Sequence, residues 1–159
     1  MITIPNKTAF QMTNALTLEA WVFTSANKTA KIFQKGDWDG FSLYQDAWNG
    51  WSFGVNFQAG GGAGIKWSSG TPILNRWYHL VGTYDGTNVN FYIDGQLVGS
   101  AAGNGQLRVT GRAIALGSDA GSLKFFNGGI DEVALYSRAL SAQEVLNHFI
   151  GARDDSKCK

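Results

Sequence analysis

Residues 75–95 constrain the fold most, because they place two Asp-Gly pairs directly after runs of aromatic and apolar residues. Asp-Gly between such runs is a strong hairpin signal, since the turn needs positive φ and glycine adopts it without steric cost. Runs of this composition favour β-strands, whose side chains pack well on a pleated surface. The stretch therefore predicts three adjacent antiparallel strands, at residues 77–84, 89–93 and 96–100.

Similar short runs recur along the chain, separated by turns that use many of its 21 glycines. They predict nine more strands, at residues 2–4, 16–23, 31–35, 41–45, 51–57, 65–68, 106–109, 113–116 and 129–136. We expect the glycine run at 58–64 to be a loop. Ser141 and Glu144 have the spacing of a capping box, which predicts one helix with Gly151 at its C-terminal cap.

A dozen short strands and one terminal helix favour an all-β fold of two antiparallel sheets. The run at 51–57 alternates strictly between apolar and small or polar residues, as expected of a strand with one face in a core. We therefore predict a jelly-roll sandwich with one short C-terminal helix over residues 1–151, followed by a polar tail over residues 152–159.

The charge balance excludes some classes of partner. The formal net charge is +1, and no basic cluster exceeds two residues. Nucleic acid requires a focused positive surface, so we expect no nucleic-acid partner, and a near-neutral surface suits neutral ligands. No apolar run approaches the ~18 residues of a membrane span. The single cysteine, Cys158, lies in the tail and excludes an internal disulfide.

Several segments of the chain together carry a family resemblance. They are WYHLVGTYDG at 77–86, FYIDGQLV at 91–98, LEAWV at 18–22, IALG at 114–117, GGIDEVALY at 128–136 and RALS at 138–141. Through them the chain resembles laminin-G-like, concanavalin A-like lectin/glucanase jelly-roll domains over roughly residues 3–150. The resemblance implies a concanavalin A-like sandwich, in a family that includes glycan binders and adhesion modules.

The resemblance also implies a structural calcium site near the final strand, where Asp131 would supply a side-chain oxygen. Calcium prefers several oxygen ligands, which carboxylates and backbone carbonyls of loops can provide. In the alternative interpretation, Asp131 caps neighbouring backbone N–H groups and no metal binds.

The sequence lacks the catalytic motifs expected of an enzyme with this fold. Glucanases of the family carry Glu-x-Asp-x-x-Glu on one strand, where alternation puts the carboxylates on one face. None of the three glutamates here has an aspartate two residues later. Asp131 and Glu132 are adjacent, so we expect their side chains on opposite faces, and we interpret His79 as structural. With no serine in a nucleophile elbow, the chain is predicted to be non-enzymatic.

Aromatic and acidic residues are concentrated between residues 37 and 67. Trp38 lies in Gly-Asp-Trp-Asp-Gly and Trp48 in Asp-Ala-Trp-Asn-Gly, so both are predicted at loop tips, whereas Trp21, Trp51 and Trp77 lie in strands and are predicted in the core. Exposed rings often mark binding sites and stack on the apolar faces of sugars, although each ring could instead fold back over an end of the sandwich. The predicted sugar site comprises Trp38, Tyr44, Trp48 and Trp67, with Asp37, Asp39 and Asp46.

These features favour a non-catalytic carbohydrate-binding module that binds polysaccharide or glycan. Such a module holds an attached partner on a polysaccharide by raising its effective concentration. We expect it to be part of a longer secreted or cell-surface protein and to contact that protein's other domains. The alternative is a protein-interaction, adhesion or structural module that uses the same aromatic residues against a protein surface.

Overall fold

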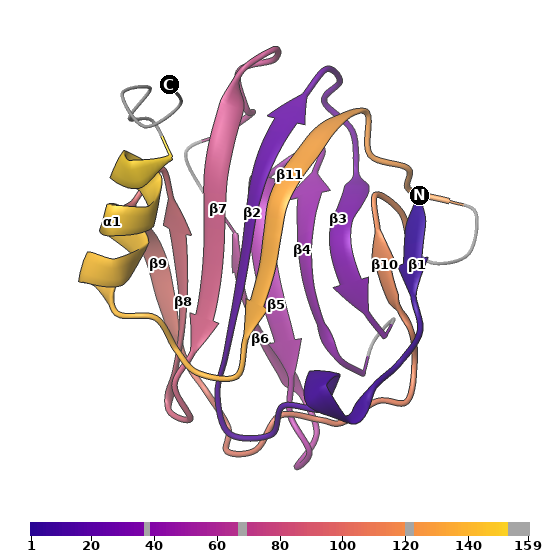
Figure 1. Ribbon diagram of the computed structural model, residues 1–159, viewed down its shortest axis with the longest axis vertical. Coiled ribbons are helices and arrows are strands. Elements are labelled where there is room, and N and C mark those ends of the chain that lie inside the picture. Colours follow the sequence, from indigo (N-terminus) through magenta and orange to yellow (C-terminus); the bar gives the residue numbers. More distant parts are fainter. Residues whose placement is uncertain (37–38, 67–69, 120–122, 153–159) are drawn as a thin grey trace.

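The computed structural model describes residues 1–36, 39–66, 70–119 and 123–152. In these parts of the chain, two antiparallel sheets pack face to face and one α-helix lies outside them (Figure 1). The six-stranded sheet has the order β1 (Ile2–Ile4), β10 (Ile114–Leu116), β3 (Ala30–Lys35), β4 (Phe41–Asp46), β5 (Gly50–Asn56) and β6 (Gly62–Lys66). The five-stranded sheet has the order β11 (Gly128–Tyr136), β2 (Leu16–Thr24), β7 (Trp77–Tyr84), β8 (Asn88–Ile93) and β9 (Gln96–Ala102). A 3-10 turn (Thr8–Phe10) precedes β2, and α1 (Ala142–Gly151) ends the described chain.

The core between the sheets follows from side-chain alternation along each strand. In β5, Trp51, Phe53 and Val55 point inward and are at most 2% exposed, as the sequence predicts. The ring of Phe53 lies against Gly82 of β7, where a Cβ would come within 2.2 Å of the ring. Glycine at this position therefore lets the two sheets approach closely. The jelly-roll sandwich expected from the sequence is confirmed.

The two Asp-Gly turns form the predicted three-strand meander. Strands β7, β8 and β9 pair in sequence order. Gly86 and Gly95 adopt φ of +99° and +77°, and Asp94 also lies at positive φ, as the second hairpin turn requires. The local signal was sufficient here because it resides in the turn residues themselves.

Three local predictions differ from the structure. Strand β6 starts at Gly62, inside the predicted loop, because its backbone pairs with β5 although glycine gives no apolar pattern. Residues 106–109 form no strand; only Leu107 makes an isolated bridge, with Phe57. The C-terminal cap of α1 is Ala152 rather than Gly151.

Helix α1 packs on the outer face of the five-stranded sheet, beside β7–β9 (Figure 1). Its predicted capping box is present: the Ser141 hydroxyl accepts a hydrogen bond from the Glu144 N–H, and the Glu144 carboxylate accepts one from the Ser141 N–H. Val145 and Leu140 form a small apolar cluster with Val81 and its neighbours on the sheet. The helix covers only part of this face, which leaves outward-pointing side chains of β2, β7 and β11 accessible.

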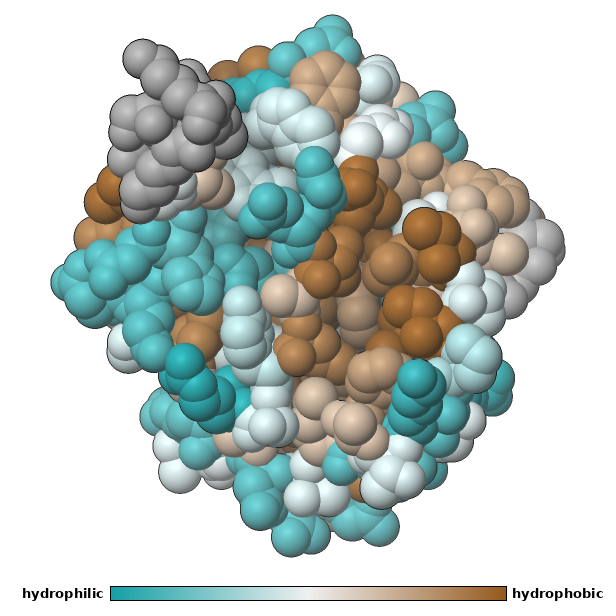
Figure 2. Space-filling view, viewed as in Figure 1, coloured by the Kyte–Doolittle hydropathy of each residue, from teal (hydrophilic) through white to brown (hydrophobic). Residues whose placement is uncertain are grey.

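Apolar surface gathers in the middle and right of the same view of the molecule (Figure 2). Partly buried apolar side chains that pack against the core include Ile130, Val133 and Leu135 of β11 and Leu116 of β10. β11 is an edge strand, so the core reaches the surface beside it. Among the described residues, no helix is long and apolar enough to cross a membrane.

Candidate functional site

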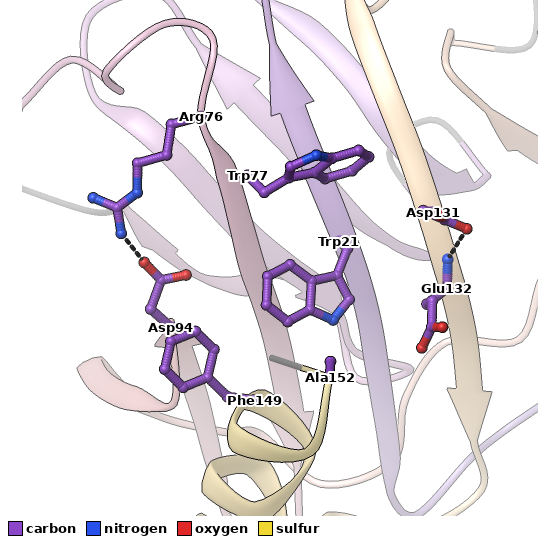
Figure 3. A pocket seen from close by; sticks show the side chains of 8 residues that line it. All are labelled: Trp21, Arg76, Trp77, Asp94, Asp131, Glu132, Phe149 and Ala152. Carbon is purple, nitrogen blue, oxygen red and sulfur yellow. Dashed lines mark hydrogen bonds and ion pairs between the residues drawn. The ribbon is translucent and has the colours of Figure 1, made fainter. Parts of the chain in front are cut away.

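A pocket of about 670 Å³ opens on the outer face of the five-stranded sheet, next to α1. Its lining comes from three strands, β2, β7 and β11, from the residue before β7, from the β8–β9 turn, and from α1 with its C-terminal cap (Figure 3). A volume of this size lies within the range of small-molecule binding sites. The lining residues are Trp21, Arg76, Trp77, Asp94, Asp131, Glu132, Phe149 and Ala152.

Two tryptophans form the middle of the pocket. Trp21 of β2 pairs with His79, and Trp77 of β7 pairs with Phe23, so the two tryptophans are diagonal neighbours on adjacent strands. Trp77 is 43% exposed. Trp21 stacks on Phe149 of α1, with ring centroids 5.9 Å apart and an interplanar angle of 15°. The helix therefore supports one ring and leaves the other open to solvent.

One side of the pocket is an ion pair between Arg76, which precedes β7, and Asp94, in the β8–β9 turn (Figure 3). Asp94 Oδ1 also accepts a hydrogen bond from the His79 backbone N–H, at 2.9 Å. The Arg76 guanidinium lies 4.6 Å from the centroid of the Tyr78 ring. Three contacts thus hold these two charged groups in place.

The opposite side is a β-bulge in β11. Asp131 pairs with Trp21 and Ala134 pairs with Glu19, so Glu132 and Val133 both lie opposite Ala20. Glu132 adopts a φ of +48°, which is uncommon for a residue with a Cβ, and Asp131 Oδ1 accepts its N–H at 2.8 Å. The extra residue breaks the alternation, and Asp131 and Glu132 both line the pocket. Our expectation that they lie on opposite faces was wrong for this reason.

A buried carboxylate attaches α1 to the sheet beside the pocket. Glu19 Oε1 lies 2.7 Å from His79 Nε2, and both Glu19 oxygens lie 3.1 Å from His148 Nδ1 on the helix. Burial raises the pKa of Glu19, but the hydrogen bonds and charges of the two histidines outweigh it and hold the pKa below its ordinary value. His79 is fully buried, as expected of a structural histidine.

Comparison with known proteins assigns the chain to a family. A family model described as the concanavalin A-like lectin/glucanases superfamily, of laminin-G type, matches residues 1–146. The chain belongs to this superfamily. No curated protein sequence matches the domain.

The solved structures that share the fold of this lectin-like domain include the following three. The binding domain of botulinum neurotoxin serotype G has a TM-score of 0.73 at 16% identity, over 96% of this chain and 42% of that chain. Domain 4 of AbnA, an extracellular GH43 arabinanase from Geobacillus stearothermophilus solved with arabinotriose, has a TM-score of 0.72 at 22% identity, over 91% and 70%. The binding domain of botulinum neurotoxin DC, solved with SialylT, has a TM-score of 0.68 at 12% identity, over 94% and 38%. The lectin-like domain spans about two fifths of the toxin binding domains that it matches.

The sugar site predicted from the sequence is not a single cluster among the described residues. Asp37, Trp38 and Trp67 lie outside those residues. Asp39 precedes β4, whereas Trp48 follows it in the β4–β5 turn, and a strand of six residues is about 17–20 Å long. Asp39 and Trp48 are therefore at opposite ends of the six-stranded sheet.

The two predicted residues near Trp48 have structural contacts of their own. Trp48 is 87% exposed, so it does not fold back over the sandwich. Asp46 Oδ1 accepts the backbone N–H groups of Trp48 and Asn49, both at 2.9 Å, and thereby shapes the turn. Tyr44 is half-buried on the outer face of β4, with the Lys31 ammonium 4.2 Å from its ring centroid.

Sequence reasoning missed the pocket because it assigned Trp21 and Trp77 to the core. The alternation of β2 did separate Trp21 from the inward-facing residues. The position of α1 determines whether the outer face of β2 is covered. No local sequence pattern predicts that position.

The calcium site expected at Asp131 stays a prediction. No group of three or more His, Cys, Asp or Glu side chains is arranged to hold a metal ion in the part of the chain that the structure describes. Asp131 does cap a backbone N–H, that of Glu132. A calcium ion bound there would depend largely on backbone carbonyls and water for its other ligands.

Proposed function

We propose that this domain is a non-catalytic carbohydrate-binding module and that sugar binds in the pocket of Trp21 and Trp77. The observation that carries the proposal is an open tryptophan, 43% exposed, next to a second tryptophan and flanked by charged groups on both sides. The apolar faces of sugar rings stack on aromatic side chains, and sugar hydroxyls hydrogen-bond to carboxylates and guanidinium groups.

The arrangement suits a ligand that is apolar on its faces and polar at its edges. In Figure 3 the two tryptophans lie between Arg76–Asp94 on one side and Asp131–Glu132 on the other. Residues of β7 and β11 are separated by two strand spacings, about 10 Å, so hydroxyls at both edges of a short saccharide can reach polar partners. The AbnA domain solved with arabinotriose supports the same class of ligand.

Binding without hydrolysis fits the hydrogen bonds that two of the pocket carboxylates already make. Glycoside hydrolysis needs one carboxyl group that carries a proton and a second that is ionised. Asp94 accepts hydrogen bonds from Arg76 and the His79 N–H, and Asp131 accepts one from the Glu132 N–H. Both carboxylates are therefore engaged by donors of the protein itself. A non-catalytic module of this kind fits a secreted or cell-surface protein that acts on, or adheres to, polysaccharide. Shorter products after incubation with polysaccharides would contradict a purely binding role.

The test is a glycan and polysaccharide array with the domain, its Trp77→Ala variant and its Trp48→Ala variant. We expect Trp77→Ala to weaken binding about tenfold or more, as truncation of an aromatic anchor does. Trp48→Ala removes an even more exposed tryptophan from the other sheet, and it should leave binding unchanged. The opposite pattern would place the sugar at the β4–β5 turn. A blank array from folded protein would reject the carbohydrate function.

The second candidate function is a protein-interaction or structural module of a longer chain. The apolar surface in the middle and right of Figure 2 favours it. A stable protein interface buries about 800 Å² per partner. Substitutions on that apolar surface would weaken such binding, whereas Trp77→Ala would not.

A further inference from the structure

We infer that the pocket accepts uncharged glycans and rejects glycans that carry carboxylates. This inference rests on the proposed function and adds the class of ligand. The described lining contains three carboxylates, those of Asp94, Asp131 and Glu132, against the single guanidinium of Arg76. The pocket therefore carries an excess of two negative charges, although the whole chain has a formal net charge of +1.

The one guanidinium is already engaged. Arg76 forms the ion pair with Asp94 and lies over the ring of Tyr78. A carboxylate on a ligand would have to displace Asp94, which is also fixed by the His79 N–H. Arg76 can still donate to a sugar hydroxyl from its remaining N–H groups, because a guanidinium has five.

The two carboxylates across the pocket have no cationic partner among the described residues. Both are exposed, and the bulge fixes their positions: Asp131 accepts the Glu132 N–H, and Glu132 has the positive φ that the bulge requires. A residue with a Cβ in this conformation is held there by its surroundings, and such strain is frequent at ligand sites. Sugar hydroxyls can donate to both carboxylates, whereas an anionic group beside them is repelled.

The aromatic rings act in the same direction. The face of a tryptophan ring carries the negative side of its quadrupole, so it attracts cations and polarised C–H groups. Trp77 lies between the two charged sides of the pocket (Figure 3). An anionic ligand would therefore meet unfavourable electrostatics from the middle of the pocket and from the Asp131–Glu132 side.

The test uses matched glycans that differ only in charge. Galactan, mannan and glucan with free primary hydroxyls at C6 are each compared with the same polysaccharide after oxidation of those hydroxyls to carboxylates. For every backbone that binds, we expect the anionic member to bind about tenfold more weakly at low salt, since like charges disfavour association. The difference should shrink in 1 M salt, where the Debye length falls to about 3 Å.

Charge variants identify the groups responsible. Asp131→Asn keeps the oxygen that accepts the Glu132 N–H, and Glu132→Gln keeps the side-chain length. In the double variant, the affinities for the neutral and the anionic member of a pair should differ by no more than about threefold. A difference of that size is typical of surface substitutions without a specific effect. Asp85→Asn is the control, because it removes a carboxylate from the β7–β8 turn outside the pocket and should leave the selectivity intact.

The outcomes separate the two proposals. Equal binding of neutral and anionic members, lost in Trp77→Ala, would overturn the selectivity and leave the carbohydrate site standing. Selectivity that persists in the Asp131→Asn, Glu132→Gln double variant would overturn the assignment to these two residues. If folded protein binds neither member of any pair, the proposed function fails and the inference fails with it.

Discussion

Replacement of Glu19 by glutamine should destabilise the attachment of α1 and thereby the pocket. The Glu19 side chain is 8% exposed and contacts His79 at 2.7 Å and His148 at 3.1 Å. Glutamine has the same shape, but it removes the charge and leaves one accepting oxygen where the carboxylate has two. Oε1 lies within hydrogen-bond distance of both histidines, so each keeps only a weaker hydrogen bond to a neutral oxygen, and His148 also loses its contact with Oε2.

The size of the effect follows from the two contacts. A hydrogen bond to a charged group contributes about 1.5–3 kcal/mol and a neutral one about 0.5–1.5 kcal/mol. The contact with His148 counts for less, because that side chain is 39% exposed and screened by solvent. We therefore expect a loss of about 2 kcal/mol in the free energy of unfolding, which lowers Tm by about 4–8 °C in a domain of this size.

Calorimetry and hydrogen exchange measure the two consequences separately. Tm should be lower in Glu19→Gln than in wild type. Relative to wild type, hydrogen exchange should accelerate at the amides of α1 more than at those of β7. Glu132→Gln is the matched control, since an exposed substitution usually changes stability by no more than about 0.5 kcal/mol. A Tm within about 1 °C of wild type, together with unchanged exchange in α1, would refute the role assigned to Glu19.

The pH dependence gives an independent check on the same residue. The pKa of Glu19 is lowered in the folded state from its ordinary value of 4.5. Because the pKa is lowered, the ionised Glu19 carboxylate stabilises the folded state fully above pH 4.5. This contribution to the free energy of unfolding is lost as the pH falls through the folded-state pKa. The difference in Tm between wild type and Glu19→Gln should therefore narrow below pH 4.5. A difference that stays constant into that range would show that the charge of Glu19 is not responsible.

Two further predictions concern other parts of the molecule. Lys35 is 1% exposed, and its ammonium donates to Asn6 Oδ1 and to the backbone oxygens of Thr110 and Arg112, at 2.7, 3.2 and 3.0 Å. Lys35→Met leaves these acceptors without their donor and should cost about 2–4 kcal/mol in chemical denaturation, whereas an unchanged midpoint would mean that water replaces the ammonium without loss. The family resemblance predicts that calcium raises Tm by binding at a site that includes Asp131. An identical Tm in calcium and in chelator would contradict this prediction.

Local chemistry made much of the sandwich predictable from the sequence. The Asp-Gly turns and the Ser141–Glu144 capping box lie within four residues of the backbone they shape, so their signals are complete in the sequence. The alternation in β5 likewise identifies its buried face. Strand β6 was missed because glycines have no side chains to alternate, and its pairing energy comes from β5.

The candidate site depended on features that local patterns do not contain. The sequence of β2 predicts that Trp21 and Leu18 lie on opposite faces of the strand. It does not predict which of the two faces remains exposed to solvent. The bulge contains no glycine or asparagine, the residues that usually indicate positive φ. Simple alternation therefore predicted Asp131 and Glu132 on opposite faces of the strand.

The sequence by itself thus predicted the hairpin turns and the N-terminal cap of the helix, because these rest on interactions between neighbours in the chain, and its strand pattern and motifs predicted the sandwich and the family. The tertiary structure alone decided where the pocket lies. Residues from positions 21 to 152 meet in the pocket, and α1 stops short of Trp77 because its contacts lie with Glu19, Val81 and Trp21. A side chain is exposed when no other segment packs against it. Which segments pack against it is determined only by the tertiary fold, because those segments are distant in the sequence.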